Sequence, residues 1–114
     1  MAIPEFEVRR VSALLERYCE ARVRPEVRHK ITIGFSVRGS AITLFERRSR
    51  FNAPSQWLEG GVARFRYDAT TATWSLYCMH RDLKWHEYLS RGPAKRFETL
   101  LNEVQADPTG IFWG

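Results

Sequence analysis

Arginine side chains are the groups in this sequence whose type and number point to a chemistry. The chain of 114 residues has 18 lysines and arginines against 13 acidic residues, which gives a net charge of +5. Fifteen of these 18 cations are arginines, whose planar guanidinium matches phosphate and carboxylate groups and stacks on aromatic rings. The excess predicts an anionic partner. A genome rich in G and C, in which arginine codons are common, is the alternative explanation.

The spacing of these cations places many of them on one side of a predicted β-sheet. In residues 27–38 and 62–68, basic or small polar side chains alternate with apolar ones, so the two kinds fall on opposite faces of a strand. Cations beside exposed rings suit single-stranded nucleic acid, because the cations neutralise phosphates and the rings stack on bases. The candidate residues for this face are Arg28, Lys30, Arg38, Phe45, Arg47, Arg64, Arg66 and Tyr77. The competing interpretation is a solvated sheet face that is rich in arginine.

Possible metal ligands gather in one short stretch, which contains Cys78, His80, Asp82, His86 and Glu87. A metal site needs such donors to converge on one point. A two-residue turn would put His80 and His86 on opposite faces, so we expect packing and hydrogen-bonding roles and no bound metal. No phosphate-binding loop, dinucleotide fingerprint or nucleophile motif is present. We therefore expect a binding protein without a cofactor in preference to an enzyme.

Glu46 departs from the alternating pattern, because it falls on the apolar side of its strand, opposite Ile33. An inward carboxylate must be paired or lie at the rim of the core. We expect a structural ion pair with Arg10 or Arg17. Left unpaired in a pocket with His29, the carboxylate would be a candidate general base, and a small enzyme centred on it is a third functional hypothesis.

Two helices follow from apolar residues at helical spacing. The first is predicted over residues 4–21, with Pro4 at the first helical position. Gly92-Pro93 is predicted to open the second helix, and Asp107-Pro108 to end it. Its predicted buried stripe is Phe97, Leu100, Leu101 and Val104.

Five strands lie between these helices. Gly39-Ser40 suits the turn of a first hairpin that sets Phe35 opposite Leu44. A second hairpin turns around residues 68–71, and "KWHEYL" reads as a fifth strand after Asp82-Leu83, with a register that stays open by one residue. The predicted fold class is α+β: an N-terminal helix, a five-stranded antiparallel meander and a C-terminal helix, with both helices on one sheet face.

Two other segments are candidates for protein contact. Residues 49–61, "SRFNAPSQWLEGG", read as a long loop that is packed by Phe51 and Trp57 or used in binding. The closing "DPTGIFWG" places Phe112 and Trp113 either back on the core or in a groove of another protein. A protein-interaction or homodimerising module, with Trp57, Phe112 and Trp113 as contact residues, is therefore the alternative function.

Length and composition bound the remaining possibilities. A chain of this size forms one domain, residues 1–114, with one core. No apolar run approaches the roughly 18 residues of a membrane span, and residues 1–25 are rich in charge, so we expect a cytoplasmic protein with no membrane partner. Cys19 and Cys78 have no metal or redox spacing and are expected to be buried free thiols.

Several separated motifs resemble one known family. They are "AIPEFEVRR", "RGSAITLFERR", "VARFRYDATTATWSLY", "KWHEYL" and "ADPTGIFWG". Together they span essentially the whole chain and are similar to a bacterial family of small proteins, family 3024 among the domains of unknown function. The resemblance implies the fold boundaries and a fixed aromatic ending. It implies no activity and no catalytic residue.

Overall fold

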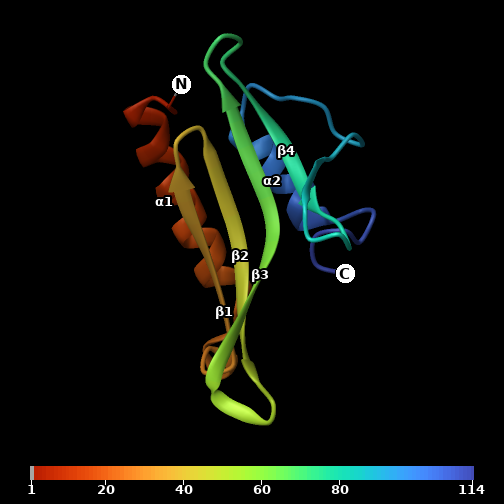
Figure 1. The fold of residues 1–114 in the computed structure, drawn as a ribbon. Helices are drawn as coiled ribbons and strands as arrows, with labels where there is room; N and C mark the ends of the chain where they lie inside the picture. Colours follow the sequence, from red (N-terminus) through yellow and green to blue (C-terminus); the bar gives the residue numbers. More distant parts are fainter. Residues whose placement is uncertain (1) are drawn as a thin grey trace.

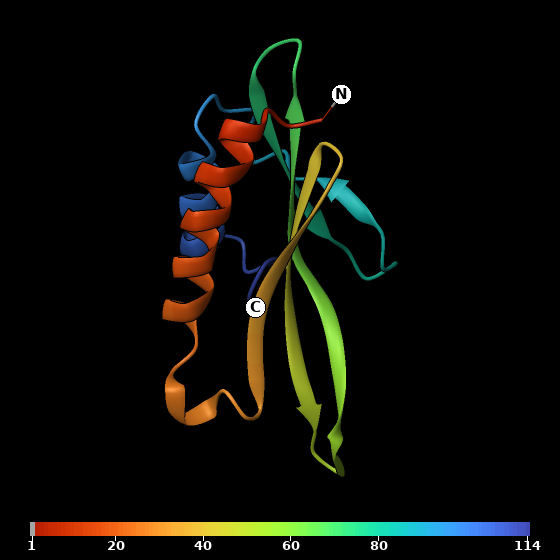
Figure 2. The same cartoon turned by 90° about the vertical axis from the view of Figure 1, so that its left-hand side faces the viewer.

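The computed structural model describes residues 2–114 as one antiparallel sheet with two helices on one of its faces (Figures 1 and 2). Each strand pairs with the next one in the sequence, in the order β1-β2-β3-β4-β5. The predicted α+β meander and the placement of both helices on one face are confirmed. In chain order the elements are α1 (Glu5–Arg22), a 3₁₀ turn (Pro25–Val27), β1 (Ile31–Arg38), β2 (Ala41–Arg50), β3 (Ala53–Asp68), β4 (Thr73–Met79), β5 (Trp85–Glu87) and α2 (Phe97–Ala106).

The β1–β2 and β3–β4 hairpins have the registers that the alternation of apolar and polar residues predicts. Phe35 lies opposite Leu44 across β1 and β2, and Phe65 lies opposite Leu76 across β3 and β4. The first turn holds Gly39 at φ +60°, a backbone conformation that glycine adopts without a steric penalty. Register follows from the length of the turn and from the burial of one face. Here the turn residues and the alternation of apolar side chains indicate both.

The prediction of a loop over residues 49–61 is wrong, because β3 begins at Ala53 and continues the ladder with β2 (Figure 1). Two irregularities interrupt the alternation of apolar and polar residues, so the pattern does not indicate this strand. Val62 is an extra residue between Ala63, which pairs with Leu44, and Gly61, which pairs with Phe45. Residues 54–56 have no ladder partner between the pairs Arg50–Ala53 and Ser49–Trp57. Such β-bulges shift the phase of the alternation.

The last hairpin has a longer turn than the expected two-residue turn at Asp82-Leu83. Met79 pairs with Trp85 and Cys78 with His86, while the backbone N–H of Leu83 donates to the carbonyl of His80. Leu83 has φ +61°, which fits a type I turn followed by a left-handed residue. The register is therefore shifted by one residue, and Trp85 lies on the sheet face that points away from the helices.

The core fills the space between the sheet and the helices. Trp74, Phe65 and Phe97 are fully buried, and Phe97 packs against both other rings, with centroids 4.5 Å apart for Phe65–Phe97 and 5.1 Å for Trp74–Phe97. The predicted buried stripe of α2 is confirmed, although the helix begins at Phe97 and is not opened by Gly92-Pro93. Cys19 and Cys78 are buried free thiols as expected, and burial raises the pKa of Cys19 to about 11 and also raises that of Cys78.

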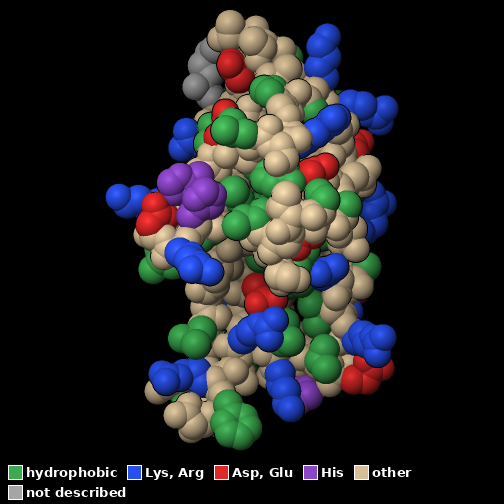
Figure 3. Space-filling view, turned by 90° about the vertical axis from the view of Figure 1, so that its right-hand side faces the viewer, with side chains coloured by type: hydrophobic (Ala, Val, Ile, Leu, Met, Phe, Trp, Pro, Cys, Tyr) green, Lys and Arg blue, Asp and Glu red, His purple; other side chains and the backbone are tan. Residues whose placement is uncertain are grey.

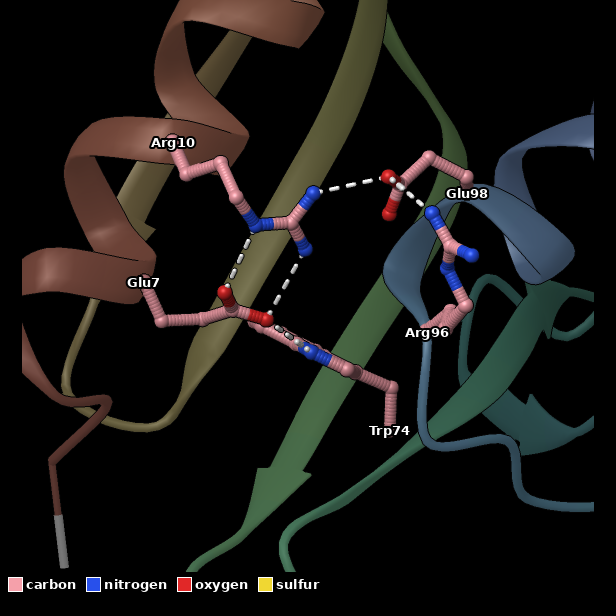
Figure 4. A network of polar contacts seen from close by, with 5 residues as sticks. All are labelled: Glu7, Arg10, Trp74, Arg96 and Glu98. Carbon is pink, nitrogen blue, oxygen red and sulfur yellow. Dashed lines mark hydrogen bonds and ion pairs between the residues drawn. The ribbon is translucent and has the colours of Figure 1, made fainter.

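A polar network joins the two helices to β4 at the edge of this core (Figure 4). The guanidinium of Arg10 donates twice to Glu7, at 2.9 and 3.1 Å, and once to Glu98 of α2, at 2.8 Å. The indole N–H of Trp74 donates to Glu7 at 3.1 Å, and Arg96 lies 3.5 Å from Glu98. Arg10 therefore links α1 to α2 and does not pair with Glu46.

The aromatic ending folds back onto the core. Asp107 ends α2 in a left-handed conformation, and its carboxylate accepts the backbone N–H groups of Phe112, at 3.0 Å, and Trp113, at 2.9 Å. Phe112 is buried against Tyr88, with ring centroids 5.0 Å apart. Trp113 is half-buried under the guanidinium of Arg22, at 4.1 Å. Of the two interpretations of the tail, the geometry is that of core closure.

Neither described helix is both long and apolar enough to cross a membrane. The molecule is elongated, with principal extents of 47 × 29 × 23 Å. The turn between β2 and β3 lies at its lower end in Figures 1 and 2, beyond the end of α1.

Candidate functional site

The sheet face that points away from the helices, hereafter the outer face, is hollowed across β1, β2, β3 and β5. The depression has a volume of about 1030 Å³ and is called the hollow below. Three guanidinium groups line it, from Arg38, Arg64 and Arg66. One carboxylate also lines it, that of Glu59, so cations outnumber anions there.

Arg64 is held in a fixed orientation at the centre of this surface. Its Nε–H donates to the hydroxyl of Thr43 at 3.0 Å, and its guanidinium carbon lies 4.7 Å from the ring centroid of Trp85. A hydrogen bond and a cation–π contact together restrict a side chain that otherwise has many rotamers. The remaining N–H groups of Arg64 are available to a ligand in the hollow.

Arg66 repeats this arrangement two residues along β3. Its guanidinium carbon lies 5.4 Å from the ring centroid of Tyr77, and among residues 2–114 no carboxylate forms an ion pair with Arg38, Arg64 or Arg66. Burial, followed by the positive charge of Arg66, lowers the pKa of the Arg64 guanidinium. The two cations repel each other, and a bound anion would relieve that repulsion.

Phe45 lies beside these cations with one face of its ring already covered. A Cβ atom built on Gly34 would lie 3.1 Å from the Phe45 ring, so the ring packs directly over the glycine of the neighbouring strand. The side chain is half-buried, whereas the nucleic-acid hypothesis expects an exposed ring. The part of the ring that lines the hollow is available for contact.

The structure gathers only part of the predicted surface. Arg38, Phe45, Arg64 and Arg66 line the hollow, and Tyr77 adjoins it through Arg66. The expectation of one continuous patch that includes Arg28, Lys30 and Arg47 is wrong, because none of these three residues lines the hollow.

Arg28 instead donates to the backbone carbonyl of Glu20 at 3.1 Å, at the end of α1. Lys30 lies beside the β2–β3 turn region, in a second depression that Phe51 also lines. Both positions follow from the 3₁₀ turn Pro25–Val27, which interrupts the alternating segment. Arg47 remains on β2, where Glu59 faces it across the ladder.

Trp85 is the residue of this surface that the sequence did not identify. Its face depended on the register of the last hairpin, which the sequence left open. Gly61 carries a signal for it in retrospect: a Cβ atom there would lie 2.7 Å from the Trp85 ring, so the glycine leaves room for the indole.

The other sequence candidates form no comparable site. Glu46 accepts from Arg48 on the same strand, at 2.6 Å, so it is paired, but with neither Arg10 nor Arg17. His80 and His86 stack on the same face with ring centroids 3.9 Å apart, and His86 contacts Asp82 at 2.8 Å. In the part of the chain that the structure describes, no three His, Cys, Asp or Glu side chains come together in a way that would hold a metal ion.

A second uncovered surface lies at the β2–β3 turn. We call residues 47–59 the hairpin end. Phe51 is fully exposed, Leu58 is 60% exposed and Trp57 is 37% exposed. Of the two interpretations of residues 49–61, packing by the aromatic side chains is wrong for Phe51, which no other described residue covers.

Comparison with known proteins identifies the family of this chain. No curated protein and no solved structure matches it. The model of a family described as a domain of unknown function, DUF3024, matches residues 3–114, which is essentially the whole chain. The chain with this helix-backed meander and arginine-lined outer face therefore belongs to the DUF3024 family.

Proposed function

We propose that this protein is a cytoplasmic, non-enzymatic nucleic-acid-binding module that uses the hollow on its outer face. The observation that supports this most directly is the set of three guanidinium groups, from Arg38, Arg64 and Arg66, in one depression without a paired carboxylate. Guanidinium groups bind phosphate oxygens through two parallel hydrogen bonds, so uncommitted ones on a single face favour a polyphosphate ligand.

The stacking contacts refine how the hollow would bind. Trp85 and Tyr77 each carry a guanidinium over the ring, so these rings orient the cations and leave less ring surface for bases. Phe45 is the ring that lines the hollow without a cation over it. The proposed mode is therefore phosphate binding by Arg64 and Arg66, with base stacking confined to Phe45.

The test is the affinity for fluorescently labelled single-stranded DNA and RNA across a salt series, measured by anisotropy. Binding should weaken linearly with log salt, by about 0.7 in slope for each phosphate neutralised. The double substitution Arg64→Gln and Arg66→Gln removes two cations and should reduce the slope by about 1.4. Substituting Phe45→Ala should weaken single strands without changing the slope.

Arg17→Gln and Arg24→Gln together form the matched control, since both side chains are exposed and lie off the sheet. The control should retain nearly the full slope. An absence of binding at low salt by the unmodified protein, which has a net charge of +5 in its favour, would remove the proposal.

A protein-interaction or self-associating module is the second candidate function. The hairpin end remains a candidate contact surface for this function, because Phe51, Trp57 and Leu58 are exposed there. The C-terminal tail does not, because Phe112 is buried. Sedimentation over a wide range of protein concentrations tests self-association. A monomer at every concentration would remove the homodimer.

A further inference from the structure

The hairpin end combines apolar side chains in an arrangement that suits insertion into a narrow site. Phe51 lies at the turn and is fully exposed. Trp57 pairs with Ser49 and Leu58 with Arg48, so these two neighbouring side chains point to opposite faces of the strand. Exposed apolar groups at the tip and on both faces favour a partner that surrounds the tip over one that covers a single flat face.

The charge of this region is strongly positive. Arg47, Arg48 and Arg50 follow one another on β2, and a depression of about 450 Å³ brings His29 and Lys30 next to Arg48 and Arg50. The strands of this region contribute two carboxylates: Glu46, which is bound to Arg48, and Glu59, which faces Arg47 across the ladder. Figure 3 shows basic side chains distributed around this lower end of the molecule. The surplus fits a polyanion and opposes the approach of a second copy of the chain.

The backbone distinguishes between two kinds of polyanionic partner. Residues 54–56 lie outside the ladder between β2 and β3. Inside a lipid bilayer the three C=O groups and the N–H groups of Ser55 and Gln56 would lack hydrogen-bond partners, at a cost of several kcal/mol for each group; Pro54 has no N–H. A nucleic-acid groove supplies water and phosphate oxygens to such groups. The irregular strand therefore favours a groove over an anionic membrane.

We infer that the hairpin end binds duplex nucleic acid, with the β2–β3 ribbon in the minor groove and Phe51 as a wedge against a base step. This inference rests on the proposed function of the outer face and adds to it a second, duplex-specific contact. Arg48 and Arg50 would contact the phosphates beside the groove. Proteins that bind the minor groove frequently combine basic side chains with an inserted apolar side chain that partly unstacks the bases.

The test compares a labelled DNA duplex with its single strand, and the duplex carries 2-aminopurine, whose fluorescence rises when the base is unstacked. Phe51→Ala should weaken duplex binding about tenfold and abolish the rise in fluorescence, with no change for the single strand. Phe6→Ala is the matched control, because Phe6 is also exposed, at 79%, but lies on α1. It should change neither measurement.

Arg50→Gln supplies a second measurement that does not depend on the wedge. Removing one phosphate contact should lower the salt slope for the duplex by about 0.9. Arg17→Gln, on the exposed side of α1, should leave the slope unchanged. Melting temperatures equal to that of the unmodified protein would establish that each variant is folded.

The outcomes separate the two proposals. If neither DNA binds, the proposed function and this inference both fail. If both DNAs bind and Phe51→Ala behaves like Phe6→Ala, the inference is overturned and the hollow remains the binding surface. Binding to vesicles that contain phosphatidylserine, lost in Phe51→Ala and unaccompanied by a 2-aminopurine signal, would also overturn it, as would a Phe51-dependent dimer without duplex binding.

Discussion

The two halves of β3 show how differently one strand behaves with and without a second layer. From Ala63 to Arg66 the strand pairs on both sides, with β2 and β4, and Ala63, Phe65 and the bulge residue Val62 are buried. Between residues 57 and 61 it pairs only with β2, residues 54–56 have no ladder partner, and every residue from 54 to 61 is exposed. The helices cover the C-terminal half of β3, hereafter the covered half. The N-terminal half, hereafter the uncovered half, extends beyond the helices (Figure 2).

This comparison indicates a division of labour within the sheet. The half that carries helices on one face accounts for the core and, on its other face, holds Arg64 and Arg66 in position. The uncovered half contributes little buried apolar area. Because burial of apolar surface is the main source of stability, the fold depends less on the side chains of the uncovered half, and these can serve in binding.

The largest expected difference is between two aromatic side chains of the same strand. Phe65→Ala removes a fully buried ring and should lower the free energy of unfolding by about 3–5 kcal/mol. Trp57→Ala, in the uncovered half, removes a side chain that is 37% exposed and should lower it by only about 1 kcal/mol. Urea unfolding followed by far-UV circular dichroism measures both. Equal losses would contradict the division of β3 into two halves.

The next largest effect concerns the network that attaches the helices to the covered half. Arg10→Met removes three hydrogen bonds to carboxylates and leaves Glu7 and Glu98 without their shared cation. One oxygen of Glu98 already has no partner. The free energy of unfolding at pH 7 should fall by about 2 kcal/mol. Arg9→Met, which removes only an exposed pair with Glu5, is the control and should have little effect.

The same network predicts how stability depends on pH. The hydrogen bond from Arg10 is the largest cause that lowers the pKa of Glu7 below its ordinary value of 4.5. For Glu98, burial raises the pKa, but the bonds from Arg10 and from its own backbone N–H outweigh burial and lower it. The resulting stability is complete above about pH 4.5 and is lost as the pH falls through the lower pKa values of the folded state. In Arg10→Met this acid-dependent loss should be smaller, and an unchanged loss would count against the network.

The smallest expected effect lies at the boundary between the two halves. A Cβ atom on Gly61 would lie 2.7 Å from the Trp85 ring, whereas one on Gly60 would meet nothing within 4 Å. Gly61→Ala should therefore displace the indole. The free energy of unfolding should fall by about 1 kcal/mol, after allowance for the stabilisation that alanine gives by restricting the unfolded chain. Gly60→Ala should be neutral or slightly stabilising. Tryptophan emission should change only in Gly61→Ala, and a matching change in Gly60→Ala would mean that the close approach is not the cause.

The sequence predicted those elements whose boundaries have a local chemical cause. Gly39-Ser40 set the first register, and the spacing of Phe97, Leu100 and Leu101 marked the buried side of α2. In the candidate site, Arg38, Phe45, Arg64 and Arg66 were found because alternation within one hairpin determines the face of each side chain.

The elements that were missed depend on interactions that alternation does not record. The bulge at Val62 makes two neighbouring residues face the core, so the strand before it looked like a loop. The sequence did not determine which face Trp85 lies on. The three-residue turn before it has Leu83 at positive φ, where a glycine would have indicated the turn. Arg28 was placed in a strand because the alternating pattern starts before the strand does.

The two buried cysteines make the hairpin end easy to examine directly. Cys19 and Cys78 are buried, and burial raises the pKa of each thiol, so both stay protonated near neutral pH and react slowly with maleimides and iodoacetamides. A cysteine introduced by Asn52→Cys at the exposed turn would be an ordinary accessible thiol. A dye or spin label can therefore be attached at the tip of the hairpin while both native cysteines remain in place, and the label would sense whatever molecule surrounds Phe51.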